Sequence, residues 1–315
     1  MDKFDAIFSA VFVYSIIRLT TPIIFATLSA IISTKCGVVN IATEGMMLIC
    51  ALTSVIISAQ TQSVGIALLS AVTIGALCGF VFIMIIIKLQ TNPILTGLAI
   101  NIIASGVTVF LLWLITGDKG ASTSLKSLKV PLLKIPFIEK IPFFGDVISN
   151  HSILTYVAFG CVLLMSILLY KTSLGLRIRA VGENENAAKS VGVNVDKTKI
   201  ISLMISGAMS GLGGAFMSMG YLSWFSTNMT AGRGFIGLAA EAMGNGTPLG
   251  GLLVSIFFGF TDAFANTMQT IISVPAELIQ MIPYLSTIVG LGIVSWLTRK
   301  NTLRQEKGVD HERGL

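Results

Sequence analysis

The chain has 315 residues, of which 54% are hydrophobic and only 11% are charged, and it carries a net charge of +6. Soluble domains carry about 25% charged residues, so this composition excludes an ordinary soluble enzyme or binding domain and predicts a polytopic membrane protein. The charges gather in the loops and at the chain ends, which favours contacts with anionic lipids and partner proteins over nucleic-acid binding.

The first apolar segment covers roughly residues 6–34 and contains both Arg18 and Pro22. A charge and a helix breaker at that depth predict an interfacial lead-in followed by the true span. The residues before this segment lack the basic region and the cleavage site of a signal peptide, so we expect the first span itself to direct membrane insertion.

The second apolar segment follows directly and is expected to begin irregularly. Gly37 is followed by Asn40 and Glu44, whose spacing of four residues would place them on one face of a helix. Irregular backbone at membrane depth is tolerated only where it lines a cavity or is buried in protein. Glu44 therefore has three possible roles: it pairs with Arg18 or Lys35, it accepts backbone N–H bonds at a helix start, or it faces a solute.

Two further spans are expected at about 64–88 and 93–116. Asn92 followed by Pro93 predicts a helix start, because Asn caps helices and Pro suits the first helical position. The second of these helices carries a polar stripe at spacings of four and three residues, which would face the protein interior or a pore. The stripe consists of Asn101, Ser105 and Thr108.

Residues 117–150 alternate prolines with lysines, which cannot form one long helix, and a single crossing is expected at 151–170. The span expected at 198–222 carries two rows of small residues at a spacing of four, which predict close packing against other helices. One row is Ser206, Ser210, Gly214 and Ser218, and the other is Gly207, Gly211 and Ala215.

Residues 232–251 are too rich in glycine and too short for an ordinary span. We predict a short helix, a turn at Asn245–Pro248, and then a full span to about residue 268. A last span should cover 276–297 before a polar tail at 298–315. The expected fold is an all-α polytopic membrane protein with about eight to ten membrane segments, some broken or short, in one transmembrane domain over residues 1–315.

Residues 171–199 form a polar island between two apolar segments and hold nine of the chain's 36 charged residues. Within it, a capped short helix is predicted that ends at a glycine. Such a helix could dock against a soluble partner, or the island could be a solvated loop. The residues of the predicted helix are Asn184, Glu185, Asn186, Ala187, Ala188, Lys189 and Gly192.

The charge pattern gives two conflicting signals about orientation. The island and the tail are rich in Lys and Arg and should be cytoplasmic by the positive-inside rule. Residues 117–150 hold five lysines as well, yet they must lie opposite the island if 151–170 crosses once. The side on which the N-terminus lies is therefore left open.

No motif of an enzyme is present. The histidines, His151 and His311, belong to no HExxH pattern, and no ATP-binding signature or GxSxG elbow occurs. The isolated cysteines fit packing better than metal binding. We therefore expect no catalytic residues, no metal site and no cofactor bound by this chain. The rival class is a stand-alone secondary transporter, in which Glu44, Glu241 and Asp262 would be the ionisable groups.

Six blocks of the sequence, given below in chain order, resemble the permease subunits of ABC importers for nucleosides and simple sugars. These importers belong to a wider family with the ribose and branched-chain amino-acid permeases. The block at residues 37–47 favours nucleoside-type over amino-acid-type relatives. Glu241 departs from the apolar residue common in that family, so a polar partner nearby is implied. The blocks are RLTTP (18–22), GVVNIATEGMM (37–47), TNPILTGLAINIIASG (91–106), the island, GRGFIGLAA (232–240) and NGTPLG (245–250).

The resemblance implies a fold like that of type II ABC importers and a set of partners. These are ATPase subunits that carry ATP and Mg²⁺ and grip the island, a second and non-identical permease, and an extracytoplasmic substrate-binding lipoprotein. The protein would lie in a bacterial cytoplasmic (inner) membrane and import nucleosides, purines favoured, with simple sugars or branched-chain amino acids as alternatives. The implied pathway residues are Asn40, Glu44, Asn92, Asn101 and Ser105.

Overall fold

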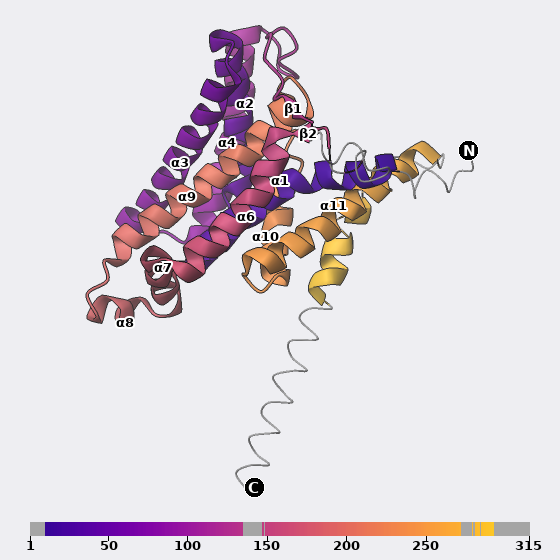
Figure 1. The fold of residues 1–315 in the computed structure, drawn as a ribbon. Helices are drawn as coiled ribbons and strands as arrows, with labels where there is room; N and C mark the ends of the chain where they lie inside the picture. Colours follow the sequence, from indigo (N-terminus) through magenta and orange to yellow (C-terminus); the bar gives the residue numbers. More distant parts are fainter. Residues whose placement is uncertain are drawn as a thin grey trace, which may run out of the picture.

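The computed structural model describes residues 10–134, 147, 149–271, 279, 281–283 and 285–292, and these residues are mainly helical (Figure 1). Within these described ranges, seven helices are long and apolar enough to cross a membrane, if η1 is counted with α9. The elements in order are α1 (Ala10–Lys35), α2 (Thr43–Thr61), α3 (Val64–Leu89), α4 (Pro93–Thr116), β1 (Leu132–Leu133), β2 (His151–Ser152), α6 (Ile153–Lys171), α7 (Ser173–Glu183), α8 (Glu185–Ser190), α9 (Val195–Ala215), the π-helix η1 (Phe216–Tyr221), α10 (Arg233–Met243) and α11 (Pro248–Ile271).

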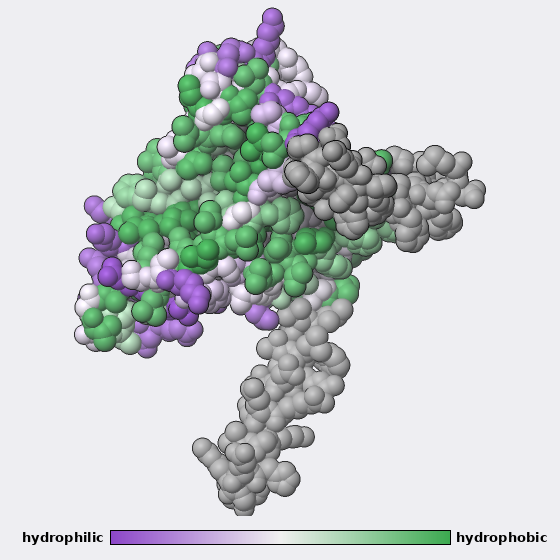
Figure 2. Space-filling view, viewed as in Figure 1, coloured by the Kyte–Doolittle hydropathy of each residue, from purple (hydrophilic) through white to green (hydrophobic). Residues whose placement is uncertain are grey.

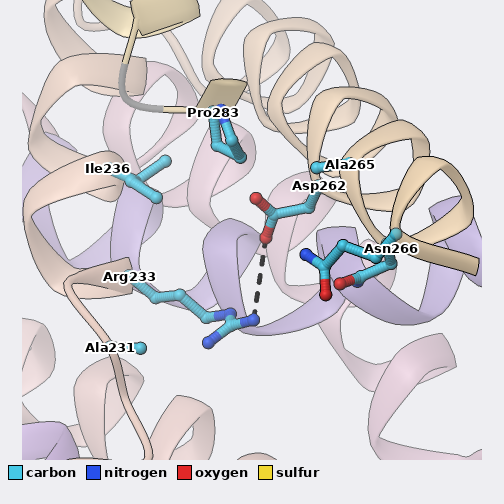
Figure 3. Close-up of a pocket in the computed structure, with 8 residues that line it drawn as sticks. Ala231, Arg233, Ile236, Asp262, Ala265, Asn266 and Pro283 are labelled. Carbon is cyan, nitrogen blue, oxygen red and sulfur yellow. Dashed lines mark ion pairs between the residues drawn. The ribbon is translucent and has the colours of Figure 1, made fainter. Parts of the chain in front are cut away.

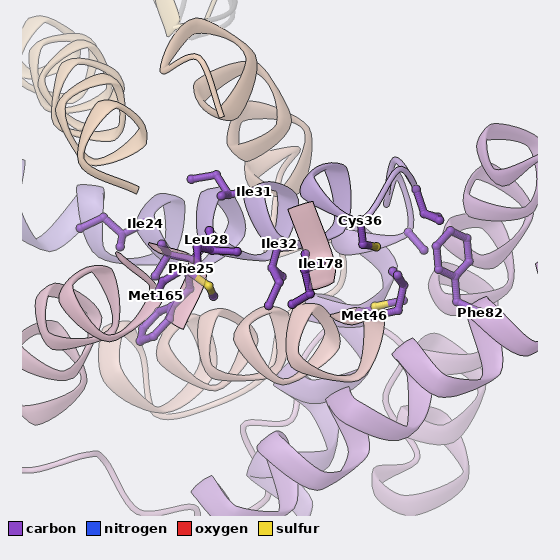
Figure 4. Packing of buried hydrophobic residues seen from close by; sticks show 14 of the residues in the cluster. Ile24, Phe25, Leu28, Ile31, Ile32, Cys36, Met46, Phe82, Met165 and Ile178 are labelled. Carbon is purple, nitrogen blue, oxygen red and sulfur yellow. The ribbon is translucent and has the colours of Figure 1, made fainter. Parts of the chain in front are cut away.

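Helix α1 lies at the centre of the fold, with α6, α9, α10 and α11 packed around it. Its side chains from Leu19 to Ser33 are buried, and they form much of the largest apolar cluster (Figure 4). That cluster extends to Met165 of α6 and Ile178 of α7. The first transmembrane helix therefore serves as the core of the protein.

Helix α9 approaches its neighbours more closely than ordinary side chains allow. A Cβ atom on Gly207 would lie 2.0 Å from the carbonyl oxygen of Gly75 in α3, and one on Gly214 would lie 2.1 Å from that of Met47 in α2. The serine row bonds across helices as well, since Ser206 donates to the Ser29 carbonyl over 2.8 Å. The close packing predicted from the rows of small residues is confirmed.

An apolar belt covers the sides of the molecule between two polar ends (Figure 2). Helices α3 and α4 are the least buried of the candidate spans and expose large apolar side chains, such as Leu69, Ile102 and Leu114. This belt is the surface expected to contact lipid.

The end opposite α8 contains a small hairpin that the sequence pattern did not predict. Leu132 pairs with Ser152 and Leu133 with His151 in an antiparallel arrangement. The ring of His151 stacks on that of Tyr14, with centroids 4.1 Å apart. Burial lowers the pKa of His151 below its usual range.

Two local predictions are wrong. Helix α1 is continuous from Ala10 to Lys35, so within the described residues Pro22 does not divide a lead-in from the span. Transmembrane helices tolerate proline because neighbouring helices and local adjustments compensate for the missing bond. Helix α2 begins only at Thr43, so Asn40 lies in the connection before it and shares no helical face with Glu44.

The C-terminal elements are confirmed as far as they are described. The short helix is α10, and the turn contains Asn245 and Gly246 at φ of +54° and +61° before α11 begins at Pro248. The last predicted span at 276–297 lies only partly within the described residues, as an apolar helix at Met281–Gly292. The tail at 298–315 lies outside them.

Candidate functional site

The island folds into two short helices, α7 and α8, of which the sequence predicted only the second. Asn184 caps α8 as expected, because its side-chain oxygen accepts a bond of 3.0 Å from the amide of Ala187. Gly192 follows the helix at φ +83°, a conformation that glycine adopts without strain. Glu185 in the first turn forms an ion pair with Lys199 of α9.

The faces of α8 differ in exposure. Asn186, Ala187 and Lys189 are exposed, whereas Ala188 is only 3% exposed. Ala188 therefore anchors α8 to the rest of the chain, and the other three side chains form the surface that a partner could reach.

The island is fixed to the transmembrane core through a backbone contact. A Cβ on Gly182, in α7, would lie 2.3 Å from the carbonyl oxygen of Lys35, the last residue of α1. No other residue type would allow α7 to approach α1 so closely. Helix α7 therefore packs directly on the end of α1, next to the connection that leads to α2.

The connection between α1 and α2 is irregular and buried. Asn40 is fully buried, and its amide nitrogen donates to the hydroxyl of Ser206 in α9 over 2.9 Å. Asn101 of α4 reaches the same region with both ends of its amide. It donates to the Ile41 carbonyl over 2.9 Å and accepts from the Gly45 amide over 2.8 Å. The side-chain amides of Asn40 and Asn101 thus hold the non-helical connection between α1 and α2 in place.

Glu44 joins the start of α2 to the start of α10. One carboxylate oxygen accepts from the Gly232 amide over 2.8 Å, and the other accepts from the Gly234 amide over 2.7 Å. The side chain thus satisfies two N–H groups that would otherwise lack partners at a helix N-terminus, and its charge suits the helix dipole there. Of the three roles considered for Glu44, the structure shows the acceptance of backbone N–H bonds.

The basic residues considered as partners of Glu44 have other contacts. Arg18 lies over the ring of Tyr221, 4.1 Å from its centroid, and donates to the carbonyl of that residue. Lys35 lies near Glu241, because a Cβ on Gly246 would stand 3.0 Å from the Lys35 ammonium and 3.2 Å from the Glu241 carboxylate. The polar partner implied for Glu241 is therefore present.

The remaining two candidates lie elsewhere on α4. Asn92 caps that helix by accepting bonds from the amides of Ile94 and Leu95. Ser105 is exposed beside the apolar Ile102, and its hydroxyl donates back to the Ile102 carbonyl. The structure therefore does not bring the five predicted pathway residues together in one cavity, and their contact with a solute stays a prediction.

A polar pocket of about 230 Å³ lies between α10 and α11 (Figure 3). Arg233 enters it from α10, and Asp262 and Asn266 enter it from α11. The guanidinium and the carboxylate form an ion pair with 3.6 Å between their atoms, and both side chains are largely buried. The other lining residues are Ala231, Ile236, Ala265, Gln269 and Pro283.

Residues 12–291 match the model of a family described as the permease component of the branched-chain amino-acid transport system. The chain belongs to this permease family. The match spans the transmembrane helices, the island and the pocket, so all the sites described above lie within the family domain.

Curated proteins similar to this permease include ABC transporter subunits. The nucleoside permease protein NupC of Lactococcus lactis is 32% identical over 87% of this chain and 89% of its own length. The guanosine permease protein NupQ of Bacillus subtilis is 36% identical over 86% of this chain and 87% of its own length. The guanosine permease protein NupP of the same organism is 26% identical over 84% of this chain and 77% of its own length. No solved structure matches the chain.

The sequence contained a signal for the pocket of the permease that the sequence analysis did not use. Asp262, Asn266 and Gln269 are spaced by four and three residues, so they follow one face of α11. The polar stripe on α4 was recognised by the same spacing. Arg233, which completes the pocket, comes from another helix, and no periodicity within α11 could have identified it.

Proposed function

We propose that this permease forms half of the translocation pathway of an ATP-driven importer for nucleosides, with purine nucleosides favoured, and that it works by alternating access. The observation that carries the proposal is the similarity to the guanosine and nucleoside permease proteins over most of each chain. A simple-sugar or a branched-chain amino-acid substrate is the alternative that the wider family allows.

ATP hydrolysis would occur on separate ATPase subunits, which would bind ATP and Mg²⁺, while this chain binds no cofactor. The exposed face of α8 is the proposed docking surface, and the α8 end of the molecule is then cytoplasmic. The contact between Gly182 and the end of α1 supports this role, because α7 packs closely on the core and α8 follows α7 directly.

The second permease is proposed to be a non-identical chain. Two different guanosine permease proteins from one organism are similar to this chain, at 36% and 26% identity, which supports a pair of unlike permeases. An extracytoplasmic substrate-binding lipoprotein would dock at the end opposite α8, where the β1–β2 pair lies. The complex would lie in a bacterial cytoplasmic (inner) membrane.

The substrate is tested by competition in cells or vesicles that contain the whole importer. Uptake of labelled guanosine should be inhibited by unlabelled adenosine and guanosine, and it should be unaffected by ribose or leucine. Inhibition by leucine with none by nucleosides would overturn the proposed substrate class.

Docking of the ATPase is tested on the exposed face of α8. Ala187→Arg should abolish uptake while the variant inserts and assembles with the second permease, because a bulky charge would occupy a small-residue surface. Lys171→Arg, at an exposed site just before α7, is the control and should take up substrate like the wild type. Uptake by Ala187→Arg at the wild-type rate would refute docking at this face.

A further inference from the structure

The pocket between α10 and α11 has polar side chains from α11, a helix that also exposes large apolar side chains such as Phe257 and Phe260. Asp262 lies in the middle of the 24-residue helix α11, and Arg233 lies at the start of α10, which begins inside the fold. A charged side chain in the centre of a bilayer costs about 2.5–3.5 kcal/mol on insertion scales, so such groups face protein or water. This side of α11 is therefore not a lipid surface, in contrast to the exposed faces of α3 and α4.

The ion pair leaves hydrogen-bonding capacity unused. The Nε of Arg233 is buried and has no hydrogen-bond partner among the described residues. One terminal nitrogen of the same guanidinium is 3.4 Å from the Thr230 carbonyl, and the other is 3.6 Å from the Asp262 carboxylate. Buried N–H groups of proteins are almost always paired, so the contacts within the described residues leave the Arg233 guanidinium incompletely satisfied.

The position of Arg233 is set firmly by the protein. Gly232 and Gly234, its two neighbours, donate the amides that Glu44 accepts, and α10 is thereby joined to α2. A side chain that protrudes from such a fixed segment presents its donors in a defined place, as a binding site requires. Glu44 therefore also fixes the backbone from which the Arg233 side chain extends.

We propose that this pocket is the contact site of the translocation pathway for the solute in this chain, and that it takes a neutral molecule of the ribonucleoside class. This inference depends on the proposed function. The carboxylate of Asp262 would accept hydrogen bonds from the ribose hydroxyls, and the terminal nitrogens of Arg233, whose contacts with Asp262 and Thr230 are long, would donate to an oxygen of the solute. Asn266 and Gln269 add amides that can both donate and accept, while Ile236 and Pro283 provide an apolar wall.

The charges of the pocket favour such a solute over an ion. Arg233 and Asp262 neutralise each other, so neither an anion nor a cation is attracted strongly. The two groups stay paired when the pocket is empty, and their mutual attraction competes with the solute. Binding is therefore weak, which suits a transporter that must release its cargo.

The experiment uses the complete importer in proteoliposomes, with its ATPase, second permease and loaded binding protein, and it compares Asn266→Ala and Asp262→Asn with the wild type. The number of guanosine molecules transported per ATP hydrolysed should fall about 2- to 10-fold in Asn266→Ala, the range expected for the loss of one hydrogen bond to the solute. Stimulation of the ATPase by the binding protein should persist. Asp262→Asn should reduce the preference for guanosine over 2′-deoxyguanosine.

Thr73→Ala is the matched control, because this exposed hydroxyl on α3 bonds only within its own helix and lies far from the pocket. It should transport like the wild type. Asn266 is also exposed, so its truncation strands no buried group and the variant should assemble normally. If both pocket variants keep the wild-type transport ratio and selectivity, the pocket is a structural ion pair and the inference is wrong.

A second measurement does not depend on the binding protein. Asn266→Cys is labelled with a membrane-impermeant maleimide, with the wild type and its four native cysteines as background. Millimolar guanosine should protect the new thiol, and millimolar leucine should not. Labelling that guanosine leaves unchanged contradicts the inference, whereas a wild-type importer that does not transport guanosine contradicts the proposed function itself.

Discussion

Replacing Glu44 tests whether this carboxylate holds the start of α10. In the variant Glu44→Leu, the amides of Gly232 and Gly234 lose their acceptor inside the protein, because Glu44 is only 9% exposed and leucine offers no oxygen. In Glu44→Gln, one oxygen remains for one of the two amides. The side-chain NH₂ group then faces the other amide, donor against donor.

The magnitude follows from the two bonds. A hydrogen bond to a charged group contributes about 1.5–3 kcal/mol, so Glu44→Leu should cost roughly 3–6 kcal/mol. Loss of the favourable charge at the helix N-terminus adds about 0.3–1 kcal/mol. Glu44→Gln should cost about half as much as Glu44→Leu. Total protein stabilities are about 5–15 kcal/mol, so Glu44→Leu removes a large share and should impair assembly.

The assay measures the yield of the purified complex and its thermal unfolding midpoint in detergent, together with guanosine uptake. The expected order of stability is wild type, Glu44→Gln and Glu44→Leu, with partial uptake in the glutamine variant. Glu183→Gln, at an exposed carboxylate of α7, is the control and should unfold at the wild-type temperature. A Glu44→Leu complex that assembles and unfolds like the wild type would refute this account.

Two further predictions concern packing and pH. Gly207→Ala should lower the complex yield, because the new Cβ would stand 2.0 Å from the Gly75 carbonyl oxygen. The matched control is Gly106→Ala in α4, where nothing lies within 4 Å of the new Cβ, and it should be neutral or slightly stabilising. Equal yields of the two variants would contradict the close contact of α3 and α9. Burial lowers the pKa of His151, so the unfolded chain binds more protons near this residue, and stability should fall as the pH drops below 6.5. The unfolding midpoint measured from pH 7.5 to 5.5 should fall less in His151→Gln, and identical slopes would exclude the effect.

The sequence was sufficient for elements whose signals are local. The caps at Asn92 and Asn184 were predicted because a cap requires only a side chain and the amides two or three residues ahead of it. The rows of small residues on α9 predicted close packing because their spacing matches one helical face. Neither signal named the partner helices, since a glycine row fits any backbone of the right shape.

The sequence was insufficient for contacts between segments that are distant along the chain. Glu44 could have paired with a cation, capped a helix or faced a solute, and only the fold brought it to Gly232 and Gly234, 188 and 190 residues away. The amide of Asn101 was expected to face inward or toward a pore, and the structure shows that it holds the backbone before α2. The strand pairing of β1 with β2 was missed because two residues in each strand carry no detectable period.

Composition, hydropathy and short-range spacing by themselves determined the membrane class, most helix positions and the capped helix in the island, because these features depend on solvent transfer and on neighbours within one or two helical turns. Only the tertiary structure decided how the helices surround α1 and which side chains bond to the backbone between α1 and α2. It also decided that Arg233 meets Asp262 beside a pocket. The physical reason is that a buried polar group requires a partner but does not specify which one. That choice is made by the packing of the whole chain.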